Sequence, residues 1–298
     1  MTTLYTIEGK LAYQDDAETD EQTLINLIKK KNEGEPIPKI PSLLLKDIEI
    51  SNIDMNLYFG EGSYDNDLYE CWQFVNCKFK SIEFNKALFK NCKFTDCSFK
   101  NCRASELIFK DCIFQSNTFY QKEKDNYTIN FSSFDNTDFI NNTFHNSKVL
   151  FNKFISVKMI DNKFINCDLT ENKYLNFNCQ NNVFNRSIMS GSNYFYSSIK
   201  ENKFKRCVMP YTEYKDVKFE GNLVSACNFK KIFSVKQKFT DNIFQECDFS
   251  ESLFCNTKFK GNKSCNPKEI IYTNCQFINT NNPSFSENKI EMNNEMAI

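Results

Sequence analysis

Aromatic residues recur in steps of five through the middle of this chain, and no other feature constrains the fold as strongly. The frame begins at Phe74 and ends at Phe259, and most of its positions are Phe. An α-helix of ~3.6 residues per turn cannot place every fifth residue on one face, and neither can a flat strand of period two. These side chains can all point inward only if the chain turns a corner once per five residues. The spacing therefore predicts a coil stacked on itself, a solenoid with one continuous core.

The residues around each frame position define one repeat unit, in which we call the frame residue the centre. Side chains two residues apart on a strand point to the same face, so the residue two before the centre should also point inward. It is small or Asn, as at Cys77, Cys97 and Asn152, which suits an interior already filled by Phe. The two residues after the centre are often Asn, Asp, Ser or Gly and are expected to form the corner.

One set of asparagines shows how many units complete a turn. Each lies two before a centre, and each is twenty residues from the next: Asn142, Asn162, Asn182, Asn202, Asn222, Asn242 and Asn262. Twenty residues are four units, so the coil should have a square cross-section. Because stacked coils lie ~4.8 Å apart, we predict that these amides hydrogen-bond in an inward ladder along one wall.

The units resemble the repeat of the pentapeptide-repeat family. Asn76-Cys77-Lys78-Phe79-Lys80 and Asp96-Cys97-Ser98-Phe99-Lys100 carry the resemblance, which covers about two thirds of the chain. It implies an all-β fold, a right-handed quadrilateral parallel β-helix, in agreement with the square coil. The family does not share one biochemical function, so the resemblance implies architecture and little about activity.

The pattern divides the chain into three regions. Residues 1–42 should form a cap, with a hairpin, a helix over 20–32 that Gly34 ends, and a Pro-rich linker. Residues 43–265 should form the β-helix, and a polar stretch at 120–130 is expected to be a loop that replaces two sides of one coil. Residues 266–298 should form a last partial coil and a C-terminal tail. A cap across the open end would protect its edge from pairing with another chain.

The sequence contains no motif for catalysis or for cofactor binding. It has no Gly-rich nucleotide loop, no zinc-protease motif and no nucleophile elbow, and its one His, His145, follows a centre. Nine of the fourteen cysteines occupy the inward small position, where Cys acts as a small hydrophobe. We therefore predict a protein that is not an enzyme and uses no cofactor, metal or small-molecule substrate. Reduced thiols and the absence of a signal peptide predict a cytoplasmic location.

Two sets of outward-facing residues are candidate interaction surfaces. One is an apolar ridge, which is a contact surface for another chain unless the N-terminal region covers it. The ridge comprises Ile155, Leu175, Phe195, Phe233, Val235 and Leu253. The other is a basic column on the adjacent side, interrupted by Asn178 and Ser198. The column comprises Lys158, Lys218, Lys238 and Lys258.

The net charge of −1 hides an asymmetry that bears on function. Residues 1–69 carry −8, residues 70–265 carry +9 and residues 266–298 carry −2. A rigid rod with surface columns favours a scaffold or adaptor that binds a protein partner, with a homodimer as one form. Some members of the similar family protect DNA gyrase or topoisomerase by mimicking DNA, but that role needs an acidic rod and is disfavoured here. Nucleic acid or anionic membrane could bind the Lys column, although Arg is scarce and basic runs are short.

Overall fold

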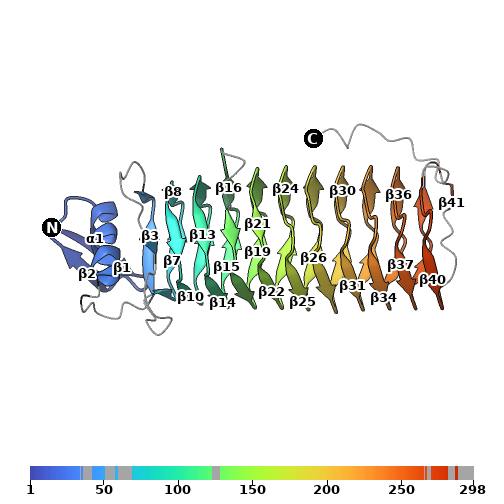
Figure 1. The fold of residues 1–298 in the computed structure, drawn as a ribbon. Coiled ribbons are helices and arrows are strands. Elements are labelled where there is room, and N and C mark those ends of the chain that lie inside the picture. The colour runs from blue at the N-terminus through green and yellow to red at the C-terminus, as the bar shows by residue number, and fades with distance from the viewer. Residues whose placement is uncertain are drawn as a thin grey trace.

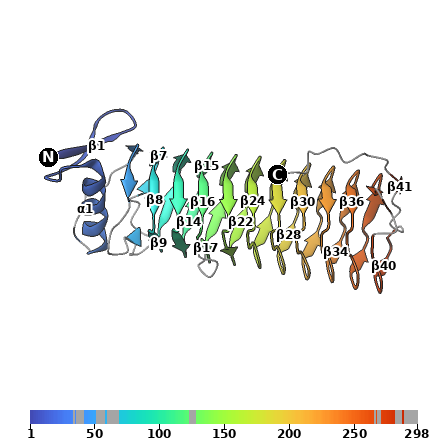
Figure 2. The ribbon, with the colours of Figure 1, turned by 90° about the horizontal axis from the view of Figure 1, so that it is seen from above.

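The structure is a computed structural model that describes residues 1–33, 35, 42–50, 58–59, 69–122, 128–264, 266, 270–280 and 286–287. These residues form a parallel β-solenoid with one helix at its N-terminal end (Figures 1 and 2). The predicted all-β, four-sided coil is therefore confirmed. The predicted linker lies almost entirely outside the described residues, as does most of the predicted C-terminal tail.

Four walls enclose the solenoid, and we name them A to D in the order in which the chain visits them. Wall A contains β3 (Leu43–Lys46), β7 (Gln73–Val75), β11 (Lys93–Thr95), β15 (Ile113–Gln115), β19 (Asp138–Ile140), β23 (Lys158–Ile160), β26 (Asn178–Gln180), β29 (Ser198–Lys200), β32 (Lys218–Glu220), β35 (Lys238–Thr240) and β38 (Lys258–Lys260). Wall B contains β4 (Glu49–Ile50), β8 (Lys78–Lys80), β12 (Ser98–Lys100), β16 (Thr118–Tyr120), β20 (Thr143–His145), β24 (Lys163–Ile165), β27 (Val183–Asn185), β30 (Lys203–Lys205), β33 (Leu223–Ser225), β36 (Ile243–Gln245), β39 (Lys263–Ser264) and β41 (Ser286–Glu287). Wall C contains β5 (Tyr58–Phe59), β9 (Glu83–Asn85), β13 (Arg103–Ser105), β17 (Ile129–Asn130) and β21 (Val149–Leu150), after which single bridges continue it as far as Ile271. Wall D contains β6 (Tyr69–Glu70), β10 (Leu88–Lys90), β14 (Ile108–Lys110), β18 (Ser133–Asp135), β22 (Lys153–Ile155), β25 (Lys173–Leu175), β28 (Asn193–Phe195), β31 (Glu213–Lys215), β34 (Phe233–Val235), β37 (Leu253–Cys255) and β40 (Gln276–Ile278).

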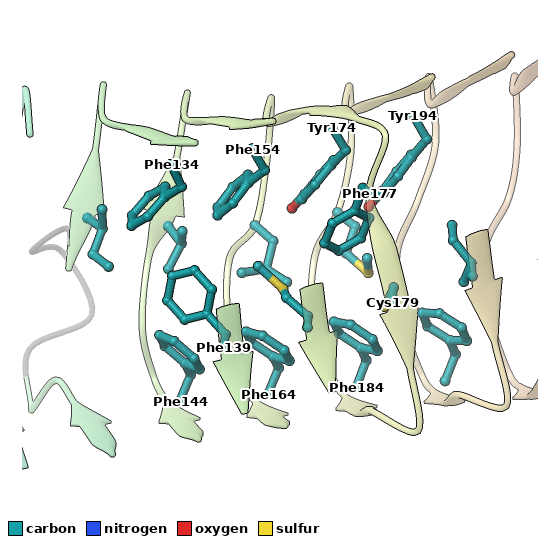
Figure 3. Close-up of a pocket in the computed structure, with 17 residues that line it drawn as sticks. Phe134, Phe139, Phe144, Phe154, Phe164, Tyr174, Phe177, Cys179, Phe184 and Tyr194 are labelled. Atoms are coloured by element: carbon teal, nitrogen blue, oxygen red, sulfur yellow. The ribbon is translucent and has the colours of Figure 1, made fainter. Parts of the chain in front are cut away.

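The core is a set of aromatic columns, one ring above the next (Figure 3). Phe164 stacks between Phe144 and Phe184, with ring centroids 4.8 Å from each. Each of these rings is at most 2% exposed. Where a centre is small, a neighbour supplies the missing volume: Cys179 replaces an aromatic centre, and the buried ring of Phe177 lies two residues before it. The apolar side chains that Figure 3 shows thus line a narrow space in the middle of the core.

Where the side chain two before a centre is Asn, Ser or Thr, it hydrogen-bonds to backbone groups of the coil that precedes it. The amide oxygen of Asn162 accepts from the backbone N–H of Asn142 at 2.8 Å, and its amide nitrogen donates to the carbonyl of Phe139 at 2.8 Å. Ser187 makes the same two bonds with its hydroxyl, both at 3.3 Å, to the N–H of Cys167 and the carbonyl of Phe164. Asn suits this position because it carries a donor and an acceptor on one short side chain.

All seven predicted ladder asparagines lie at this position, on the corner that leads into wall B. Each amide oxygen from Asn162 to Asn262 accepts both from the backbone and from the amide of the rung before it. The ladder has an earlier rung that the twenty-residue spacing did not reveal. The backbone N–H of Asn117 donates to the side chain of Asn142 at 2.9 Å.

The loop after β16 does not replace two sides of a coil, contrary to the expectation from the sequence. Ile129 pairs with Ala104 on one side and with Val149 on the other, so wall C is continuous. The insertion instead lengthens one turn from twenty residues to twenty-five, as the pairing of Phe109 with Phe134 shows. Five extra residues equal one repeat unit, and for this reason the frame of centres is preserved.

The N-terminal residues close the first coil. β1 (Thr2–Thr6) and β2 (Leu11–Asp15) form an antiparallel hairpin, and β1 pairs antiparallel with β3 at the edge of wall A. α1 (Asp20–Asn32) buries Leu24, Leu27 and Ile28 completely. The first centres are Leu45 and Ile50, which pair with the main frame of walls A and B.

Candidate interaction surface

Wall D carries all six residues of the apolar ridge, in two groups. Ile155, Leu175 and Phe195 follow one another in register on β22, β25 and β28. Leu175 is 36% exposed and the other two are half-buried. Lys215 then interrupts this column, and Val235 comes after it. The structure thus brings three ridge residues into direct succession near the middle of the rod.

The remaining ridge residues lie nearer the C-terminal end of wall D. Phe233 and Leu253 pair on β34 and β37, one residue before the centre rather than one after it. Phe233 is exposed and Leu253 is half-buried. Their column therefore follows the opposite edge of the wall from that of Leu175.

Four exposed aromatic side chains border wall D, and none of them belongs to the ridge predicted from the sequence. Phe131, Phe151 and Tyr211 lie on the corner between walls C and D, and Tyr196 lies on the corner between walls D and A. The rings of Phe131 and Phe151 stack at 5.2 Å with planes 11° apart. Among the described residues of the solenoid, seven of the twelve exposed large apolar side chains lie on wall D or on these two corners. Apolar exposure is therefore concentrated on one side of the rod.

The backbone at these four aromatics is left-handed. Their φ angles lie between 48° and 58°, because the residue two after each centre turns the corner in this conformation. A residue other than Gly pays ~1–2 kcal/mol for it, and Asn or Asp are the side chains that tolerate it best. A bulky ring at an exposed corner gains no core burial in return. Because nearly every corner of the rod shares this conformation, the repeat itself requires it, and the large ring is what distinguishes these four positions.

A small charged cluster marks the same corner further along. The ammonium of Lys231 donates to the hydroxyl of Tyr211 at 3.4 Å and lies 3.5 Å from the carboxylate of Glu251. The hydrogen bond to Tyr211, followed by the charge of Glu251, raises the pKa of Lys231 above its ordinary value. Lys231 also lies 5.4 Å from the ring centre of Tyr211, within cation–π range.

The basic column lies on wall A, where its members are in register with one another. Lys158 pairs with Asp138 at 3.3 Å and is followed by Asn178 and Ser198. Lys218, Lys238 and Lys258 then come in unbroken succession. Within the described ranges these three form no ion pair, so three like charges follow one another ~4.8 Å apart.

The described part of the N-terminal region does not reach the ridge. α1 contacts β1, β2 and β5, all at the first coil. Both views place α1 at the end of the rod, whereas β22, β25 and β28 are near its middle (Figures 1 and 2). This part of the chain acts as an end cap and leaves the ridge uncovered.

The side chains that could take part in chemistry are buried or scattered. Burial raises the pKa of the Cys102, Cys167, Cys179 and Cys247 thiols to about 12, so they are protonated at neutral pH. No three Cys, His, Asp or Glu side chains of the described residues gather closely enough to hold a metal ion. In the same part of the chain, no helix is long and apolar enough to cross a membrane.

Three features repeat along the rod: the chain turns a corner every five residues, four walls enclose the core, and polar inward side chains hydrogen-bond to the preceding coil. The chain has the pentapeptide-repeat fold. In this pentapeptide-repeat solenoid, the distinguishing features are the apolar wall D and the basic column on wall A, since the core is set by the repeat.

Comparisons with known proteins found one family model and several solved structures that are similar to this chain. The family described as "SV2A/B/C luminal domain" matches residues 46–144, less than half of the chain. The pentapeptide-repeat protein HetL from Nostoc sp. strain PCC 7120 is 7% identical, over 79% of this chain and 87% of its own, with a TM-score of 0.36. The fluoroquinolone resistance protein QnrB1 is 13% identical, over 66% and 92%, with a TM-score of 0.26. The adhesin PfbA from Streptococcus pneumoniae is 10% identical, over 92% and 90%, with a TM-score of 0.37.

A search of curated protein sequences found no match. The TM-scores and identities of the structural neighbours are too low to support an inference about function, and the fold is identified from the strand register of this chain.

Proposed function

We propose that the protein is a non-catalytic scaffold that binds another protein chain through wall D. The observation that carries this proposal is the collection of exposed apolar and aromatic side chains on wall D and on the two corners that border it. Exposed apolar patches of this kind mark contact surfaces on soluble proteins. The rod itself supplies rigidity, because many rings of its core stack between two others, as Phe164 does between Phe144 and Phe184. Since the thirteen described cysteines are all free, the proposal also places the protein in a reducing compartment such as the cytoplasm.

A photo-crosslinking amino acid provides a direct test with a matched control. Leu175 on wall D and Ile165 on wall B are both one residue after a centre of the same coil. A photo-reactive residue in place of Leu175 should capture a protein partner in cells, and the same residue in place of Ile165 should capture little. Equal capture from both walls, or none from wall D, would contradict the proposal.

Binding of a polyanion along wall A is the rival function, and the unbroken succession of Lys218, Lys238 and Lys258 is the observation that favours it. DNA or an anionic membrane would bind there with a strong dependence on salt. Replacing Lys218 and Lys238 with Glu should then abolish a DNA mobility shift that the wild type gives at low salt. If the wild type gives no shift at low salt, the rival is excluded.

Mimicry of DNA, as an inhibitor or protector of gyrase or topoisomerase, finds less support. It needs a succession of acidic side chains that imitates phosphates, whereas the longest like-charge succession described above is basic. A gyrase supercoiling assay with and without the protein separates this function from the others, because neither a scaffold nor a polyanion binder of this kind requires the enzyme as its target.

A further inference from the structure

Wall D has a pattern of side chains that is complementary to itself when the rod is reversed. Its strands follow one another one coil apart, so every strand has a mate at the same distance on the other side of β25. The mates are β22 with β28, β18 with β31, β14 with β34, and β10 with β37. A two-fold axis through β25, perpendicular to the rod and in the plane of contact, would lay each strand of one copy on the mate strand of another.

The apolar side chains match under this operation. Leu175 would meet Leu175 of the second copy at the axis, and Ile155 would meet Phe195. On β14 and β34, which each lie three strands from β25, Ile108 would meet Phe233, and both side chains are at least partly exposed.

The aromatic corner matches in the same register. Phe131 would face Tyr211 of the second copy, and Phe151 would face Gly191, the one residue of that corner column without a side chain. A large ring opposite a glycine, and two rings opposite each other, are combinations that allow close approach of two faces.

Two contacts between charged side chains also match, each joining opposite signs. Asp135 on β18 would face Lys215 on β31 of the second copy. Asp111 and Lys236, each at the corner between walls D and A, would face each other three coils from the axis. Within the described ranges, neither Lys215 nor Lys236 has an ion-pair partner in its own chain. Because the axis repeats each contact, these residues would form four ion pairs per dimer.

The match depends on the register. If the axis passed through β28, one coil away, Leu175 would face Lys215, and Asp135 would face the apolar edge at Cys255. The register centred on β25 leaves two like-charge contacts at the axis, because Lys173 would face Lys173 of the second copy and Glu171 would face Glu171.

We propose that wall D is the interface of an antiparallel homodimer whose two-fold axis passes through β25. This inference rests on the proposed function, in which wall D is the binding surface, and it names a second copy of the chain as the partner. The charge and apolar complementarity of the wall with itself is what favours a second copy over an unrelated protein.

A charge exchange at one contact tests the arrangement with the full chain. Asp111→Lys alone, or Lys236→Asp alone, converts two attractive contacts into two repulsive ones. Each should weaken dimerisation by about 10- to 100-fold in sedimentation equilibrium, since exposed pairs contribute modestly. An equimolar mixture of the two variants should form a heterodimer, and the double variant should dimerise like the wild type. Failure of both the mixture and the double variant to recover would overturn the proposed register.

Cross-linking at the axis and the shape of the dimer provide a second test. Leu175→Cys should form an intermolecular disulfide under mild oxidation, and the control Ile165→Cys on wall B should not. Small-angle scattering should give a dimer about as long as the monomer, because the rods lie side by side. A dimer twice as long, or a wild type that remains monomeric at all concentrations, would overturn the homodimer. If that monomer still captures another protein through a photo-reactive residue in place of Leu175, the proposed function stands alone, whereas absence of any capture refutes both.

Discussion

Removal of one rung of the Asn ladder tests how the solenoid is held together. The amide of Asn182 accepts from the N–H of Asn162 at 2.8 Å and donates to the carbonyl of Met159 at 2.7 Å. Asn182→Ala leaves the N–H of Asn162 buried without a partner, which costs ~1–3 kcal/mol, whereas the carbonyl of Met159 keeps the ladder bond of the parallel pairing between β23 and β26. We therefore expect the free energy of unfolding to fall by ~1–3 kcal/mol. Asn182→Ser removes a similar volume but keeps a hydroxyl that can make both bonds, as Ser187 does, and should lose about half as much.

The assay has to separate hydrogen bonding from lost volume, and to allow for partial unfolding of a repeat protein. Urea titration followed by circular dichroism gives the global free energy for the wild type and both variants. Hydrogen exchange at the amide of Asn162 reports the orphaned donor itself and should accelerate most in Asn182→Ala. The amide of Asn202 serves as the internal control, because its acceptor, Asn222, is untouched. Equal unfolding midpoints for the two variants, or unchanged protection at Asn162, would refute the reasoning.

The remaining predictions concern the core, the thiols and the corners. Phe164→Ala should lower the free energy of unfolding by ~3–5 kcal/mol, whereas Lys163→Ala beside it should change it by less than ~0.5 kcal/mol, and equal denaturation midpoints would contradict the stacked core. Burial raises the pKa of Cys102 and Cys247 in the folded protein to about 12, above the ordinary value of 9.0. Their contribution to the free energy of unfolding is therefore complete below pH 9 and is lost as the pH rises toward 12. At about pH 10 the free energy of unfolding should be ~1.4 kcal/mol lower per thiol. An unfolding midpoint that stays the same between neutral and alkaline pH would count against the burial of these thiols. Rapid labelling of the native protein by a thiol reagent would count against it too. Tyr196→Asn should raise the free energy of unfolding by ~1 kcal/mol because Asn tolerates the left-handed corner, and a destabilised variant in thermal melts would show that the ring packs instead.

The spacing of Phe predicts most of this architecture, because a period of five allows only one way to bury every centre. The twenty-residue spacing of the asparagines likewise predicts four walls, since each rung must lie above the last. The loop after β16 could not be interpreted in the same way, because an insertion of five residues leaves the frame unchanged and only strand pairing shows that wall C continues. Asn117 was hidden for the same reason, being twenty-five residues from Asn142.

The candidate surface was only partly visible in the sequence. The frame places Leu175 and Phe195 on the outside, but exposure depends on which neighbours are large enough to cover them. Phe131 and Phe151 could have been identified from the sequence as exposed aromatic residues, since they occupy a corner position that is otherwise rich in Asn and Asp. Compensation such as that of Phe177 for Cys179 depends on packing in three dimensions, and the frame alone gives no sign of it.

The hydrogen bonds made by Asn, Ser and Thr side chains two before a centre make the folding of the rod depend on the order of its synthesis. A coil receives these partners for its backbone only from the coil that follows it, so the newest turn on the ribosome lacks them until the next turn is made. At ~5–20 residues per second, a twenty-residue turn emerges in about 1–4 seconds, and folding should lag translation by about one turn. Backbone groups of the last turn also need hydrogen-bond partners, and on the corner that leads into wall A a threonine supplies them. The hydroxyl of Thr280 accepts from the N–H of Thr257 at 3.0 Å and donates to the carbonyl of Phe254 at 3.1 Å.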